Sequence, residues 1–170
     1  MNHTTRFALI LAGTQIAIAL LLFGLGLDTV ESLSMVTGTI TTAIMAYICF
    51  LNLRHYRDIE NNGFMSVGQA VGRGFKTGLI GGGFLAVFYF FYYKFINPAF
   101  LDRLQIREEQ KLEEQGLSGD KLEQAINFME IGFQPLWQAV STYLGIILFV
   151  LVASLILSAF MKKENPSAPW

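Results

Sequence analysis

Four long apolar stretches dominate the chain, and most of the charged residues lie between them. The stretches cover about residues 7–27, 34–53, 77–96 and 138–161, and the only charged residue inside them is Lys94. About 20 apolar residues in an α-helix cross the hydrocarbon core of a bilayer. A soluble helix bundle would need a polar face on each helix, which these stretches lack. The pattern predicts an all-α integral membrane protein, in which residues 1–170 form one domain with a bundle of four transmembrane helices.

The most polar segment is the connection 98–135 between the third and fourth predicted spans. Pro98 and Gly116 are typical of the start and stop of a helix, and Ser118 or Asp120 can cap a second one. Apolar residues recur at helical spacing in that second helix, at Leu122, Ala125, Ile126, Met129 and Phe133. We predict a helical hairpin, which either covers the mouth of the bundle or places each helix in the membrane interface.

Lysine and arginine are distributed unevenly around the predicted spans. The first loop, with Asp28 and Glu31, has no basic residue, whereas the amino-terminal arm, the second loop and the carboxyl tail all do. Those basic residues are Arg6, Arg54, Arg57, Arg73, Lys76, Lys162 and Lys163. Four spans put these three places on one side, and basic segments favour the cytoplasm. We predict that both termini, including the tail 162–170, are cytoplasmic and that the hairpin is extracytoplasmic.

The basic residues of the second loop have two open interpretations. Arg54, Arg57, Arg73 and Lys76 either contact lipid head groups or serve only to orient the protein. Anionic lipids attract such juxtamembrane side chains by about 1 kcal/mol each. Arg57 and its neighbour Asp58 can also pair with each other at the interface.

A glycine-rich segment, VGRGFKTGLIGGG at residues 71–83, raises the possibility of a phosphate-binding loop. It fits neither of the glycine patterns G-x-x-x-x-G-K-[ST] and G-x-G-x-x-G. Instead, Gly74, Gly78 and Gly82 repeat every four residues, a spacing that lets membrane helices approach closely. A matching stripe of small residues lies on the second span, at Gly38, Thr42 and Ala46. We predict that the two stripes form a helix-packing seam.

Composition and motifs argue against an enzyme. Charged residues make up 15% of the chain and its net charge is −1, which excludes the basic footprint of a nucleic-acid partner. The single cysteine, Cys49, lies in an apolar stretch and is predicted to be buried and inert. Glu109 and Glu113 belong to a charge run that is typical of a solvated helix. His3 and His55 have no nucleophile at a recognisable spacing, so we predict no catalytic residue, metal or cofactor.

The interiors of the predicted spans contain no ionisable residue, which disfavours a proton relay. Their polar residues are mostly threonine and serine, which can bond to their own helix or across an interface. Gln15 is the exception, because a buried amide needs partners at both ends. Together with Thr37 and Thr41, it could line a polar path through the bundle.

Several phrases of the sequence are similar to a known family. They are RHYRD at 54–58, NNGFMSVGQAVGRGFKTG at 61–78, FINPAF at 95–100 and GLSGDKLEQA at 116–125. In these phrases and their order, residues 7–163 resemble the domain-of-unknown-function 4199 family of Gram-negative bacterial membrane proteins. The resemblance implies a small four-span inner-membrane protein, and it brings no assigned activity.

These observations favour a non-enzymatic, multi-pass protein of the bacterial inner membrane with a structural, accessory or oligomer-forming role. Its expected partners are the lipid bilayer and either itself or another membrane protein, with no nucleic acid. The alternative is a small transporter or channel for a neutral or amphipathic solute, lined by Gln15, Thr37 and Thr41.

Overall fold

The computed structural model describes residues 2–27 and 35–163, and in these ranges the chain folds into helices joined by short connections. The elements are α1 (His3–Gly24), α2 (Met35–His55), the π-helical turn η1 (Tyr56–Glu60), α3 (Val67–Phe91), the π-helical turn η2 (Tyr92–Ile96), α4 (Ala99–Glu114), α5 (Asp120–Gly132) and α6 (Pro135–Met161). The predicted all-α class is confirmed. The first loop, with Asp28 and Glu31, lies outside the described residues.

Three helical segments in the described part of the chain are long and apolar enough to cross a membrane. They are His3–Gly24, Val67–Ile96 and Pro135–Met161. They correspond to the first, third and fourth predicted spans, and they are consistent with a membrane protein. The second predicted span coincides with α2, which is not among these three.

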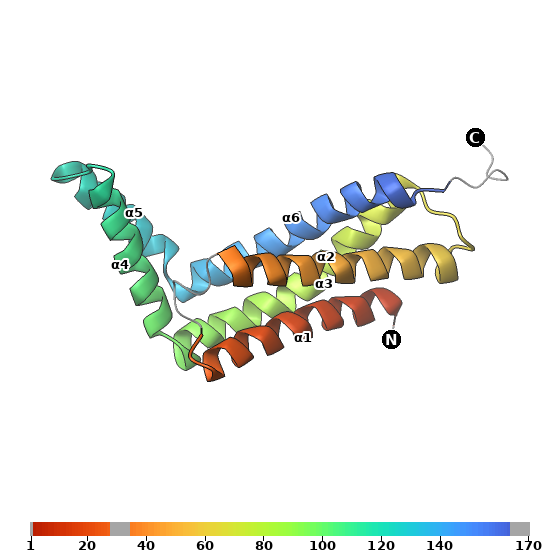
Figure 1. Ribbon diagram of the computed structural model, residues 1–170, viewed down its shortest axis with the longest axis horizontal. Helices are drawn as coiled ribbons and strands as arrows, with labels where there is room; N and C mark the ends of the chain where they lie inside the picture. Colours follow the sequence, from red (N-terminus) through yellow and green to blue (C-terminus); the bar gives the residue numbers. More distant parts are fainter. Residues whose placement is uncertain (1, 28–34, 164–170) are drawn as a thin grey trace.

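Four helices, α1, α2, α3 and α6, run alongside one another in the bundle (Figure 1). At one end His3 of α1 lies against His55 of α2, with ring centroids 4.5 Å apart. At the other end Phe23 of α1 lies 6.0 Å from Tyr92, measured between ring centroids. Since α3 also ends at this second place, α1 and α3 run parallel and α2 runs back between their ends.

The bundle has a continuous apolar core. Leu11, Leu85 and Val150 are almost completely buried, and they bring α1, α3 and α6 together. Cys49 of α2 joins the same cluster, so its predicted burial is confirmed. Protein interiors pack at near-crystalline density, so these side chains interlock. Their packing fixes the rotation of each helix relative to its neighbours.

α3 begins ten residues before the predicted start of the third span at residue 77. Ser66 is the reason, because it forms a capping box with Gln69. The amide of Gln69 donates to Ser66 Oγ at 3.2 Å, and the amide of Ser66 donates to Gln69 Oε1 at 2.9 Å. The capped turn lets the helix start outside the apolar stretch, so the glycine-rich segment is entirely helical.

The three glycines at four-residue spacing face α6, and the partner predicted for them was wrong. A Cβ at Gly74 would overlap Ser154, one at Gly78 would lie 3.1 Å from Ile147 Cα, and one at Gly82 would lie 3.3 Å from the carbonyl oxygen of Tyr143. Glycines later in α3 face residues earlier in α6, so α3 and α6 are antiparallel. A different glycine, Gly81, faces α1, where its Cβ would lie 3.1 Å from the carbonyl oxygen of Ala8. The small-residue stripe on α2 instead lines a groove together with residues of α6.

Helices α4 and α5 lie side by side and extend away from the end of the bundle opposite His3 (Figure 1). α4 begins after Pro98 and ends before Gly116, whose φ of +85° favours glycine. The cap predicted for α5 was wrong, because the N-cap is Gly119 and no side chain caps the helix. The predicted apolar face of α5 is its half-buried face, whereas Phe128, on another face, is 81% exposed.

Candidate functional site

A polar cluster occupies the end of the bundle where α1 and α3 begin and α2 and α6 finish. Its centre is Arg73 of α3, a residue that is only 8% exposed. The guanidinium donates two hydrogen bonds to Glu60 of η1, from Nη1 to Oε2 at 2.8 Å and from Nη2 to Oε1 at 2.6 Å. Its Nε donates to Asn52 Oδ1 at 3.1 Å. Arg73 therefore joins α2, η1 and α3.

The side chains behind Arg73 complete its hydrogen bonding. Asn52 and Thr77 are both 1% exposed, and Asn52 Nδ2 donates to Thr77 Oγ1 at 2.9 Å. The hydroxyl of Thr77 in turn donates to the carbonyl oxygen of Arg73 at 3.0 Å. Buried polar groups are costly unless they are bonded in this way. The cluster is therefore a fixed structural unit rather than a loose surface ion pair.

The π-helical turn η1 brings Glu60 to Arg73. Its five residues are wound more loosely than an α-helix, and such turns often occur at functional sites. Hydrogen bonds from Arg73 hold the pKa of Glu60 below its ordinary value of 4.5, and the positive charge of Arg73 acts in the same direction. Glu60 is accordingly ionised at neutral pH.

Arg73, predicted either to contact lipid head groups or to orient the protein, is buried at the end of the bundle. Its guanidinium is enclosed by Glu60, Asn52 and the ring of Tyr56, which lies 5.0 Å from the guanidinium carbon. Three of its five N–H groups are used in bonds within the protein. Burial could not be read from the sequence, because arginine next to a span usually points to the head groups.

The other three basic residues of this region are more exposed. Lys76 is exposed, and the side chain of Arg54 is 61% exposed, with its Nε 3.6 Å from Asp58 Oδ2. Arg57 donates to Asp58 Oδ1 at 2.6 Å, so the pairing considered from the sequence is present. This hydrogen bond raises the pKa of Arg57 and lowers that of Asp58. Contact of Arg54 and Lys76 with lipid head groups stays a prediction.

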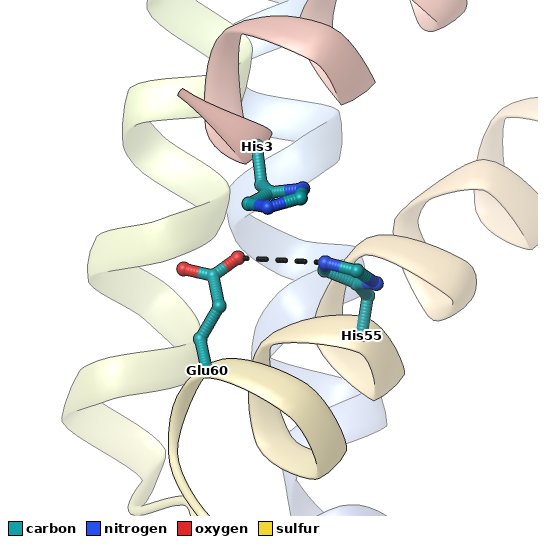
Figure 2. A group of neighbouring side chains, drawn as sticks. All are labelled: His3, His55 and Glu60. Atoms are coloured by element: carbon teal, nitrogen blue, oxygen red, sulfur yellow. Dashed lines mark ion pairs between the residues drawn. The ribbon is translucent and has the colours of Figure 1, made fainter. Parts of the chain in front are cut away.

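Two histidines lie beside Glu60 and form a second part of the cluster (Figure 2). One nitrogen each from His3 and His55 and an oxygen from Glu60 all lie within 4.8 Å of one another. His55 Nε2 is 3.9 Å from Glu60 Oε1, and it is buried without a hydrogen-bond partner among the described residues. The sequence analysis missed this group, because the two histidines are far apart in the chain and follow no metal-binding spacing.

An apolar groove of about 690 Å³ separates α2 from α6; we call it the α2–α6 groove. Its walls are Gly38, Thr39, Thr42, Ala43 and Ala46 of α2 and Phe149, Val152, Ala153, Ile156 and Leu157 of α6. The α2 wall contains the small-residue stripe that was predicted to meet the glycines of α3. Thr42 and Val152 are exposed, so the groove opens at the surface of the bundle.

The polar residues predicted to line a path are engaged in helix contacts. Gln15 is buried and its Nε2 donates to the carbonyl oxygen of Thr41 at 3.4 Å. The hydroxyl of Thr41 donates to the carbonyl oxygen of Gly38 at 3.0 Å. The side chain of Thr37 lies outside the described residues. The bond of Gln15 joins α1 to α2, whereas the bond of Thr41 lies within α2. The transport hypothesis stays a prediction.

Comparison with known proteins agrees with the resemblance seen in the sequence. A family model described as a protein of unknown function, DUF4199, matches residues 6–163. No curated protein and no solved structure matches the chain. Since the family match covers nearly the whole sequence, the protein belongs to the DUF4199 family of proteins of unknown function.

Proposed function

We propose that the chain is a four-span protein of the bacterial cytoplasmic membrane that acts, without catalysis, by pairing with a second copy of itself in the bilayer. The observation that carries this proposal is the α2–α6 groove, which is apolar, open and lined on its α2 side by small residues. Its likeness to other proteins adds no specific role, because the matching family has none assigned.

The path of the chain supports four spans. α1 and α3 run parallel, with His3 close to His55 at one end and Phe23 close to Tyr92 at the other. The segment between them must return across the same thickness, and α2 is the 21-residue helix that does so. At 1.5 Å per residue, a helix of this length spans about 30 Å, the thickness of the hydrocarbon core.

The distribution of basic residues supports cytoplasmic termini. The amino-terminal residues contact the end of α2, and Met65 forms a two-bond bridge with Lys163 next to the end of α6. Arg6, Arg54, Arg57, Lys76 and Lys162 therefore belong to one end of the bundle. Basic residues near span ends are retained in the cytoplasm, which makes α4 and α5 extracytoplasmic.

The shape of the α2–α6 groove supports a helix as its occupant. Gly38, Thr42 and Ala46 place small side chains at four-residue spacing along one wall. In lipid, such stripes allow close backbone contact between helices, and van der Waals packing is the main attraction. A two-fold axis beside Thr42 lets α2 of each copy enter the groove of the other, so both grooves are filled at once.

Cysteine crosslinking tests this pairing. Cys49 is buried, and it is replaced by alanine to leave a chain without other thiols. We expect Thr42→Cys to give a disulfide-linked dimer in native membranes on mild oxidation. The matched control is Ala17→Cys. Ala17 is an exposed residue of α1, two residues after Gln15, whose side chain bonds to Thr41 of α2, so Ala17 and Thr42 lie at a similar level of the bundle. The Ala17→Cys variant should remain monomeric.

A bulky substitution provides an independent measurement. Thr42→Trp should fill the groove and shift the detergent-solubilised protein from dimer to monomer, as measured by light scattering. Ala17→Trp should leave the dimer unchanged. A wild-type protein that is monomeric in membranes, or equal crosslinking through Thr42→Cys and Ala17→Cys, would overturn the proposal.

A further inference from the structure

We propose that His3, His55 and Glu60 bind a divalent first-row transition-metal ion, for which Zn²⁺ is the best match. Two imidazoles and one carboxylate form a donor set that zinc sites use, with a fourth position for water. Figure 2 shows the three side chains converging on one space from the start of α1, the end of α2 and the end of η1. The inference is independent of the proposed pairing.

The distances are close to those of a bound ion. The three ligand atoms lie within 4.8 Å of one another, whereas zinc ligands at about 2.1 Å from the metal are about 3.4 Å apart in a tetrahedron. Side-chain rotation therefore has to bring the atoms together by about 1 Å. His3 is exposed and lies in the first turn of α1, so its ring has room to make most of this movement.

The environment of His55 points to a missing partner. Its Nε2 is shielded from solvent and forms no hydrogen bond within the described residues. Buried polar atoms of this kind are rare in folded proteins and call for an explanation such as an ion. A metal ion at this place would accept the Nε2 lone pair. The ring of Phe7 also packs against His55, at a centroid distance of 5.6 Å.

Arg73 fixes the carboxylate ligand. It donates to both oxygens of Glu60, but a carboxylate oxygen has two lone pairs, so Oε1 can bind a metal as well. Hydrogen bonds to ligating carboxylates are a usual part of metal sites and orient the ligand. A cavity of about 400 Å³ is lined by Glu60, Arg73 and Lys76, so one side of the carboxylate ligand faces open space.

The donor types select among metals. Magnesium and calcium prefer sites built entirely from oxygen, whereas imidazole suits zinc, cobalt and other transition metals. The ion would connect the first turn of α1 to the end of η1, two segments that are distant in the sequence. It would thus fasten one end of the bundle.

Zinc titration of the full chain tests the site. The protein is purified in detergent with an affinity tag free of histidine, and Zn²⁺ binding is measured by calorimetry. We expect one Zn²⁺ per chain, a rise in the unfolding temperature with Zn²⁺, and no such rise with Mg²⁺. His3→Ala should weaken Zn²⁺ binding at least about tenfold, the lower range for loss of a supporting residue. Its unfolding temperature without metal should stay unchanged, because His3 is exposed.

Two controls separate this site from other carboxylates. Glu113→Gln changes an exposed residue of α4 and should leave Zn²⁺ affinity unchanged. Co²⁺ should give the visible absorption of a tetrahedral site in the wild type and lose it in His3→Ala. The inference is overturned if neither His3→Ala nor His55→Ala alters Zn²⁺ affinity, or if Glu113→Gln abolishes binding.

Discussion

Gly74 shows how little space separates α3 from α6. A methyl group at this position would lie 2.8 Å from Ser154 Cβ and 3.2 Å from the carbonyl oxygen of Val150. The first of these distances is shorter than real Cβ contacts, so the two helices would have to move apart. Gly83 lies on the same helix, and no atom is found within 4 Å of a Cβ placed there. The same substitution should therefore have different effects at the two positions.

We predict that Gly74→Ala lowers the free energy of unfolding by about 1–3 kcal/mol, as overpacking of a close contact does. Gly83→Ala should leave it unchanged or raise it, because alanine restricts the unfolded chain. Thermal unfolding in detergent measures both. In the double variant Gly74→Ala, Ser154→Gly, the side chain that collides with Ala at position 74 is absent. The double variant should therefore lose less stability than the sum of the losses in the two single variants. Additive losses would show that the contact does not limit the helix spacing.

Glu60 gives a prediction on pH. Its pKa is lowered in the folded protein, so the ion pair with Arg73 stabilises fully above the ordinary value of 4.5. This contribution is lost as the pH falls from that value through the lowered pKa of the folded state, because the unfolded chain takes up the proton first and is stabilised by it. Glu60→Gln should lower stability at pH 7 by about 2 kcal/mol, less than for a fully buried pair, because the Glu60 side chain is 24% exposed.

The difference between wild type and Glu60→Gln should shrink between pH 5 and pH 3, as measured by unfolding in detergent. Glu123→Gln, on the exposed side of α5, is the control and should follow the wild-type curve. A constant difference across this range would mean that Glu60 titrates as an ordinary carboxyl group.

At the scale of the element, helix ends illustrate where sequence patterns succeed. Pro98 and Gly116 bound α4 as predicted, because proline and a positive φ act through the local backbone. Ser66 caps α3. Ser118, one of the two alternative caps predicted for α5, lies before the actual N-cap residue, Gly119. Ser66 lies one residue and Ser118 two residues before the first residue of its helix, and the structure shows which of them is the cap.

The two serines form a matched pair for mutation. We predict that Ser66→Ala lowers the free energy of unfolding by about 1 kcal/mol, because the amide of Gln69 loses its acceptor. Ser118→Ala should change it by less than about 0.5 kcal/mol, the usual range for surface substitutions. Chemical unfolding in mild detergent measures the two variants. Equal effects would contradict the capping role of Ser66.

At the scale of the whole molecule, the bundle has a basic end, formed by the amino terminus, the α2–α3 connection and the end of α6, and an opposite end that continues into α4 and α5 (Figure 1). This polarity makes the orientation testable. In a Cys49→Ala background, we expect a membrane-impermeant maleimide to label Gln110→Cys of α4 in intact spheroplasts. Lys162→Cys should be labelled only after the membrane is opened, because basic ends remain in the cytoplasm.

The reverse labelling pattern would place α4 and α5 in the cytoplasm. Labelling of both positions in intact spheroplasts would place the two ends of α6 on the same side and contradict four spans. Agreement with the expected pattern would support the orientation without identifying a partner.

The sequence by itself determined the properties that depend on local composition. It predicted the helices and four membrane spans, and three of the four coincide with segments that are long and apolar enough to cross a membrane. It also singled out Gly74, Gly78 and Gly82, because their spacing places them on one face of a helix. Family membership followed from phrases of the sequence and is confirmed over residues 6–163.

Only the tertiary structure decided which faces meet. The rotation of each helix depends on the packing of all its neighbours, so the glycines of α3 contact α6 while the small stripe of α2 borders a groove. The same packing buries Arg73 against Glu60 and brings His3 beside His55. These contacts join residues that are distant in the chain, so no local sequence pattern predicts them.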